Sequence, residues 1–136
     1  MPRKQFKLLL AVAGVVVVSG SAATVAQGSG GLPGTQETFL TGYEEVPALS
    51  VPGGGSFRVK MTGSDELSYR LSYANTSATV TQAHIHFGQL SVNGGVSVFL
   101  CTNLGNGPAG TQACPDSGTI TGTITAANVI GPAGQG

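Results

Sequence analysis

Strict alternation of apolar and polar residues is the clearest pattern in this chain, and it marks two neighbouring segments. In residues 56–61 every second side chain is apolar, beginning with Phe57, and residues 66–73 repeat the pattern. Because successive side chains of a β-strand face opposite sides, a period of two predicts half-buried strands. The intervening residues 62–65 read Thr-Gly-Ser-Asp, which is typical of a turn, so we expect the two strands to form a hairpin.

Four further segments show weaker strand patterns, separated by turn clusters. They are residues 38–43, 81–87, 96–101 and 119–125. Short strands broken by Gly-rich turns predict an all-β fold, either an antiparallel sandwich or an open barrel. The expected core comprises Phe39, Phe57, Val59, Leu67, Tyr69, Leu71, Ile85, Phe87, Val98, Leu100, Ile120 and Ile124.

The first 26 residues have the pattern of a secretory signal peptide. Basic residues precede an apolar run over residues 8–18, and small residues follow, with cleavage favoured after Ala23 or Ala26. The apolar run is shorter than the roughly 20 residues that span a bilayer. We therefore expect an exported protein, extracellular or periplasmic, with no stable membrane insertion after cleavage.

Beyond the signal segment, the chain divides into a linker and one domain. Residues 27–35 are rich in Gly, Ser and Pro and predict a flexible linker, and the β domain is expected over residues 36–136. Three of the six Lys and Arg residues lie in the signal segment, so three cations remain against six Asp and Glu, about −3 in all (3 − 6). Such a sparse, mildly acidic surface argues against nucleic acid as a partner.

Cys101 and Cys114 are the only cysteines and flank a turn-rich segment. In an exported protein, an isolated pair of this kind favours a disulfide. The alternative interpretation is two unpaired thiols. The spacing fits no standard zinc motif, so a metal site built from this pair alone is disfavoured.

His84 and His86, the only histidines in the chain, carry the most specific chemistry. Their spacing places both imidazoles on one side of the predicted strand, where they could bind one metal ion. The apolar residues of that strand, such as Ile85, are expected to face the core, so the histidines would face solvent, a groove or another sheet. The alternative is that each imidazole only forms hydrogen bonds with the backbone or nearby loops.

Two histidines make an incomplete metal site, so a third ligand must come from elsewhere. The chain offers Glu44, Glu45 and Asp116 as candidates.

Several motifs of the predicted β domain resemble the CHRD domain, a family named after chordin and also found in exported bacterial proteins. Residues 40–47 read Leu-Thr-Gly-Tyr-Glu-Glu-Val-Pro, and residues 83–88 read Ala-His-Ile-His-Phe-Gly. The resemblance extends over roughly residues 37–136, and the two motifs together make it specific. Further matching segments are 53–57, 93–96, 99–101 and 118–125.

The resemblance implies an immunoglobulin-like, Greek-key β-sandwich with no established biochemical activity. CHRD domains normally continue with a helical segment and a final strand that carries an Asn-Val-His-Thr motif, whereas this chain ends at Gly136. We therefore expect the domain to be incomplete at its C-terminus, leaving a sheet edge uncovered.

CHRD domains also bear a distant resemblance to Cu/Zn superoxide dismutase, in which a His-x-His pair on a strand supplies two copper ligands. His84 and His86 correspond to that pair in pattern. The chain has no further histidine for the remaining ligands, so we expect no dismutase activity.

These observations predict an exported, non-enzymatic CHRD-type module with a structural or protein-interaction role. Its expected partner is a protein or another component of the cell envelope. The alternative is a metal-binding domain in which His84 and His86 hold copper or zinc, and no other cofactor is indicated.

Overall fold

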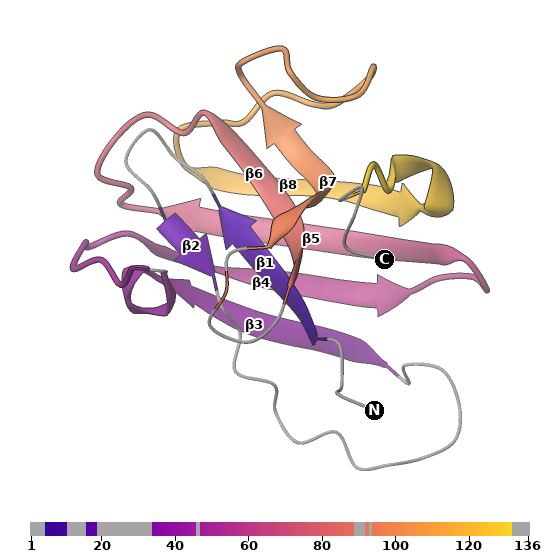
Figure 1. Cartoon of the computed structure of the whole chain (residues 1–136), viewed down its shortest axis with the longest axis horizontal. Coiled ribbons are helices and arrows are strands. Elements are labelled where there is room, and N and C mark those ends of the chain that lie inside the picture. The colour runs from indigo at the N-terminus through magenta and orange to yellow at the C-terminus, as the bar shows by residue number, and fades with distance from the viewer. Residues whose placement is uncertain are drawn as a thin grey trace.

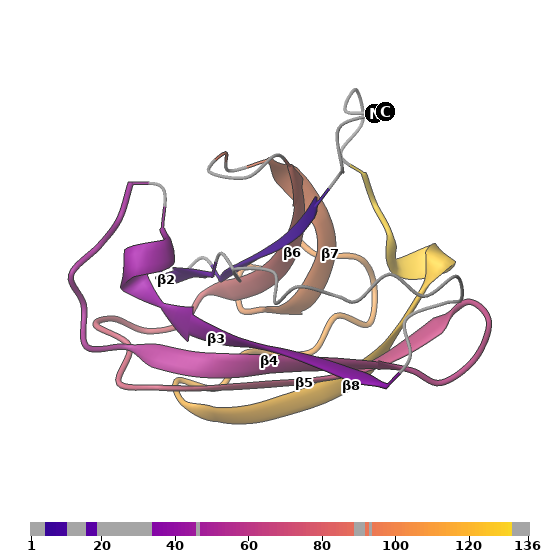
Figure 2. The same ribbon diagram turned by 90° about the horizontal axis from the view of Figure 1, so that it is seen from below.

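Two four-stranded antiparallel sheets stack as a β-sandwich (Figure 1, Figure 2). The computed structural model describes residues 5–10, 16–18, 34–45, 47–88, 92 and 94–131. One sheet has the order β3 (Thr35–Thr41), β4 (Gly54–Met61), β5 (Glu66–Ala74) and β8 (Gly118–Thr125). The other has the order β2 (Val16–Val18), β1 (Gln5–Leu10), β6 (Gln82–Gly88) and β7 (Gly95–Thr102).

The predicted all-β antiparallel sandwich is confirmed, and each of the six predicted strands corresponds to one of β3 to β8. The predicted hairpin joins β4 to β5, where the Thr62 amide donates to the Glu66 carbonyl at 3.0 Å. Two short 3-10 helices, η1 (Gly42–Glu44) and η2 (Ala126–Asn128), follow β3 and β8. Alternation along a strand was therefore a reliable guide to the architecture of this chain.

Strands β1 and β2 lie within the predicted signal segment. They pair with each other, and β1 also pairs with β6, so that Leu8 lies opposite Ile85. The predicted linker lies outside the described residues except for its last two positions, 34 and 35, where β3 begins. The signal peptide and the missing C-terminal strand stay predictions.

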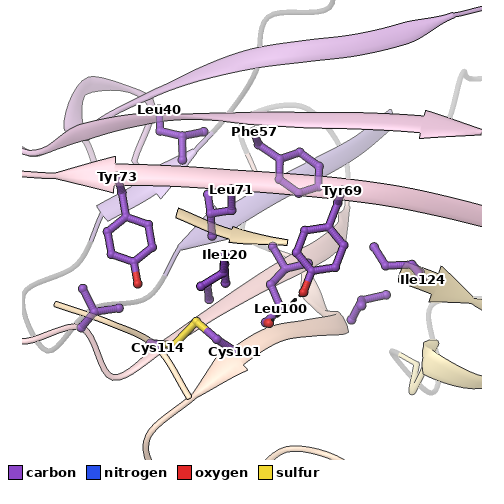
Figure 3. Packing of buried hydrophobic residues seen from close by; sticks show 13 residues of the cluster. Leu40, Phe57, Tyr69, Leu71, Tyr73, Leu100, Cys101, Cys114, Ile120 and Ile124 are labelled. Atoms are coloured by element: carbon purple, nitrogen blue, oxygen red, sulfur yellow. Dashed lines mark hydrogen bonds between the residues drawn. A yellow bond between two sulfur atoms is a disulfide. The ribbon is translucent and has the colours of Figure 1, made fainter. Parts of the chain in front are cut away.

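Side chains from both sheets fill a single core between them (Figure 3). Most of the predicted core residues are buried there or packed against its margin. The prediction that Phe39 belongs to the core was wrong, because its side chain is 73% exposed. In β3 the neighbouring Leu40 is the buried residue, and alternation then turns Phe39 to the outside.

Tyr69 of β5 links the two sheets across this core. Its hydroxyl donates to the Leu100 carbonyl of β7 at 3.0 Å and accepts from Gln112 Nε2 at 2.7 Å. The ring lies over Gly122 of β8, where a Cβ atom would approach the Tyr69 ring to 2.6 Å. Gly122 is therefore required by a close approach across the strand pair.

The predicted disulfide between Cys101 and Cys114 is present, with the Cα atoms 5.1 Å apart. It fastens the end of β7 to the segment that leads into β8, and both cysteines belong to the core (Figure 3). Asn103 holds the same loop, since its Nδ2 donates to the carbonyls of Val80 and Cys114, each at 2.8 Å. The loop is thus fixed to the sandwich at both of its ends.

Candidate functional site

Strand β6 places His84 and His86 beside each other, with their ring centroids 5.7 Å apart. The intervening Ile85 packs against the core, as alternation predicts. The pairing with β7 is irregular, with register shifts between Ala83 and His84 and again between Ile85 and His86. Such bulges re-aim side chains locally and are common next to functional sites.

His84 is buried rather than open to solvent, being only 2% exposed. Phe99, its cross-strand neighbour on β7, meets the imidazole edge to face with ring centroids 4.3 Å apart. Within the described part of the chain, neither ring nitrogen has a hydrogen-bond partner. Burial, and secondarily the nearby His86, lower the pKa of His84 to about 4. At neutral pH the ring is therefore uncharged, which is the form that binds metals.

His86 is half-buried and has one nitrogen tied to the backbone. Its Nδ1 lies 3.1 Å from the Gly94 carbonyl oxygen, which can only accept, so Nδ1 carries the proton and Nε2 keeps a lone pair. Burial lowers the pKa of His86, and the hydrogen bond to Gly94 partly offsets this. An imidazole oriented in this way by a carbonyl is typical of metal-ligating histidines.

Gly94, whose carbonyl faces His86 Nδ1, has a backbone conformation that favours glycine. Its φ of 26° is a conformation that side chains rarely adopt, and a Cβ atom there would lie 2.9 Å from the Gly88 Cα. The backbone directly before β7 therefore depends on glycine at this position.

The acidic residues considered as third ligands do not join the histidines. In the residues that the structure describes, no group of three or more His, Cys, Asp or Glu side chains could hold a metal ion. Glu44 lies in η1, Glu45 follows it directly, and Asp116 lies in the loop before β8. The described site thus consists of the two imidazoles alone.

Glu45 has an unusual environment that the sequence did not reveal. It is only 5% exposed, and its Oε1 atom has no partner among the described residues. Burial raises the pKa of this carboxyl to about 8. A carboxyl that stays protonated near neutral pH is a poor partner for a cation until it loses that proton.

A surface cleft lies elsewhere, between β7, β8 and the loop formed by residues 108–112. Its lining includes Tyr69 and Gln112 but neither histidine. Phe99 also lines the cleft, so the cleft adjoins the histidine pair through the ring that contacts His84.

The CHRD domain matches residues 37–131, about 70% of the chain. The chain belongs to the CHRD domain family. The match includes both histidines and both cysteines, so the resemblance seen in the motifs is confirmed.

No curated protein and no solved structure matches this CHRD chain significantly. Among the residues that the structure describes, none forms a helix long and apolar enough to cross a membrane.

Proposed function

We propose that this CHRD chain is an exported, non-enzymatic module that acts by binding through the outer face of the β3-β4-β5-β8 sheet. The supporting observation is that β6 and β7 cover only the inner face, and no described segment lies over the outer one (Figure 2). We call this outer face the open face. Its outward side chains are Glu37, Phe39, Ser56, Arg58, Lys60, Glu66, Ser68, Arg70, Ser72, Thr119, Thr121 and Thr123.

The open face is suited to binding because its side chains are accessible and held by a regular scaffold. They alternate along each strand with buried residues such as Leu71 and Ile120, whose packing keeps the sheet rigid. Register within this sheet is continuous across all three strand pairs. Charges and hydroxyls therefore lie in fixed rows, in contrast to side chains on a mobile loop.

Retention on the cell envelope tests this function. The purified full chain should bind the envelope or extracellular-matrix fraction of the producing cells. A variant with Arg58→Gln, Lys60→Gln and Arg70→Gln together should lose most of this binding while it melts at an unchanged temperature. Equal retention of both proteins would show that the open face is not the binding surface.

Export is tested separately by N-terminal sequencing of the protein recovered outside the cytoplasm. Cleavage after Ala23 or Ala26 would give a mature chain that begins at Thr24 or Gln27. Recovery of the protein only from the cytoplasm, with an intact N-terminus, would contradict the proposal.

Metal binding by His84 and His86 is the second candidate, favoured by the unpartnered nitrogens of His84. A buried polar group without a partner costs roughly 1–3 kcal/mol, so such groups in native proteins call for an explanation such as a bound water or ion. His84 offers an unprotonated nitrogen whichever tautomer it adopts, and His86 offers Nε2. Copper and zinc are the ions that prefer imidazole ligands.

Titration of the full chain with zinc and with copper at neutral pH tests this candidate. His84→Ala or His86→Ala alone should weaken binding at least about tenfold, because too few other ligands remain. Ile85→Val is the matched control, since it changes the same strand on the opposite side and should leave metal affinity unchanged. If neither zinc nor copper binds, the histidines have a structural role.

A further inference from the structure

We infer that the open face binds an acidic polysaccharide whose sugars carry carboxylates. This inference rests on the proposed function and names the chemistry of the partner. Four features carry it: the position of the cations, the paired arginines, the rows of hydroxyls and the exposed aromatic ring.

The first feature is the distribution of positive charge. Beyond residue 7 the chain has only three Lys or Arg residues, namely Arg58, Lys60 and Arg70, and all three project from the open face. The face also carries two carboxylates, each with an intramolecular partner. Glu37 accepts from Arg58 at 2.8 Å, and Glu66 accepts from the Thr62 hydroxyl at 2.7 Å. An otherwise acidic domain therefore gathers its cations on one side, where an anion would be attracted.

The second feature is the direct opposition of two like charges. Arg58 and Arg70 are cross-strand partners in the β4–β5 pair, an arrangement that is unfavourable in the absence of an anion. Glu37 compensates only Arg58. Arg70 donates to the Thr119 hydroxyl at 3.4 Å, and no ion pair forms at Lys60 within the described chain. Carboxylates bound at Arg70 and Lys60 would supply the missing charge.

The third feature is the regular arrangement of hydroxyls beside these cations. One row across the sheet aligns Ser56, Ser72 and Thr119, and the next aligns Arg58, Arg70 and Thr121. Neighbouring strands are about 4.8 Å apart and alternate residues about 6.8 Å apart, so four strands present a surface roughly 14 Å wide. Extended sugar chains present hydroxyls and carboxylates along a flat ribbon, which such rows complement.

The fourth feature is Phe39, which lies in the hydroxyl row opposite Ser56 and is 73% exposed. An exposed aromatic ring can stack on the apolar C–H face of a sugar while neighbouring polar groups bind its substituents. A protein partner would instead require an apolar, charge-depleted centre, and Phe39 is the only large apolar residue of the open face. The chemistry of the face therefore favours a glycan over a protein.

Titration of the isotope-labelled full chain with oligogalacturonate, followed by NMR, tests this inference. A neutral maltooligosaccharide of the same length and a poly-glutamate peptide of similar charge serve as the comparison ligands. We expect oligogalacturonate to shift the resonances of β3, β4, β5 and β8 and the other two ligands to leave them largely unchanged. The affinity should fall as salt is added.

Variants that are expected to change the affinity in opposite directions test whether the ligand binds at the open face. Arg70→Gln should weaken binding about fivefold, which corresponds to an exposed ion pair. Glu37→Gln should strengthen it, because it removes a carboxylate that competes for Arg58. Asp116→Asn is the matched control, since it changes the net charge by the same amount in the loop before β8 and should leave the affinity unchanged. Phe39→Ala should weaken binding without lowering the melting temperature.

The outcomes separate this inference from the proposed function. Shifts confined to the open face and lost with Arg70→Gln would support an acidic glycan. Equal binding of poly-glutamate, or equal effects of Glu37→Gln and Asp116→Asn, would overturn it in favour of unspecific attraction. If the envelope fraction binds through the same face but oligogalacturonate neither binds nor competes, the glycan inference fails and the binding module stands.

Discussion

The two sheets of this CHRD domain differ in how they place polar groups. In the β3-β4-β5-β8 sheet the register is continuous, and the charged residues Arg58 and Arg70 stay at the surface. In the β6–β7 pair the register shifts twice, and His84 and Ser97 are buried with side-chain atoms that lack partners among the described residues. The regular sheet supplies rigidity and an accessible face, whereas the irregular pair carries unsatisfied groups in its interior.

This difference indicates which of the two sheets carries groups that lower the stability of the fold. Unsatisfied buried groups persist only where the rest of the structure compensates for them. The disulfide at the end of β7 and the Tyr69 hydrogen bond to Leu100 connect the irregular pair to the regular sheet. The regular sheet therefore supports the irregular pair, and substitutions should affect the two sheets differently.

The largest expected effect is on the core of the regular sheet. Leu71→Ala should lower the free energy of unfolding by about 2–5 kcal/mol, because Leu71 is fully buried and the sheet cannot collapse around the cavity. Ile85→Ala in β6 should lie at or below the lower end of that range, since Ile85 is only partly buried. Urea unfolding measures both, with Thr121→Ala on the open face as a control that should change stability by less than about 0.5 kcal/mol. A larger loss at Ile85 than at Leu71 would reverse the comparison.

The second prediction concerns the buried His84, where we expect a substitution to raise stability. Without metal, His84→Phe should raise the free energy of unfolding by about 1–2 kcal/mol, because it removes the unpartnered nitrogens and keeps the edge contact with Phe99. His86→Phe is the matched control and should be destabilising, since it breaks the hydrogen bond to Gly94. Urea unfolding in the presence of a chelator distinguishes them. Destabilisation by His84→Phe would mean that the imidazole makes favourable polar interactions in the folded protein.

The same contrast explains how much of the molecule could be predicted from the sequence. Strands β4 and β5 were predictable because their alternation is strict, and it also placed Arg58 and Arg70 on the outside. Their direct opposition could not be derived from the predicted four-residue turn, because five residues, 62–66, separate the paired Met61 and Leu67. Phe39 was wrongly assigned to the core because the prediction relied on its hydrophobicity. Alternation along β3 instead turns Leu40 inward and Phe39 outward.

The residues of the candidate site could be predicted from the sequence, but the surroundings of their side chains could not. The spacing of His84 and His86 placed the two rings together, as the structure shows. Their burial could not be inferred, because it depends on two register shifts and on Phe99 of another strand. The raised pKa of Glu45 was likewise hidden, since it follows from the way that η1 turns a carboxyl inward.

The third prediction concerns the pH dependence of stability that Glu45 causes. Its pKa rises from an ordinary 4.5 to about 8, so between these values the folded protein keeps a proton that the unfolded chain releases. The contribution of the protonated carboxyl to stability is therefore complete below pH 4.5 and is lost as the pH rises toward 8. Glu45→Gln should remove this loss and gain stability relative to the parent protein between pH 5 and pH 8, as thermal melts would show. An unchanged pH profile would mean that Glu45 is ionised when folded.

The fourth prediction concerns the edge of the irregular sheet. Because β1 lies in the predicted signal segment and pairs with β6, removal of residues 1–26 would leave the β6 backbone without that partner. Amide hydrogens of β6 should then exchange faster, while those of β4 and β5 should remain unchanged. Hydrogen exchange on the full chain and on a chain that begins at Gln27 measures this difference. Equal exchange in β6 would show that β1 contributes no protection.

The smallest expected effect is at Phe39, and it tests whether the regular sheet separates stability from binding. A 73% exposed ring on an edge strand contributes little to the core, so Phe39→Ser should change the free energy of unfolding by less than about 0.5 kcal/mol. Leu40→Ser, one position away but fully buried, should destabilise strongly, because it leaves a cavity and an added hydroxyl inside the sandwich. Urea unfolding of the two variants tests the alternation at single-residue resolution. A strong loss at Phe39 would place its ring in the core and remove it from the open face.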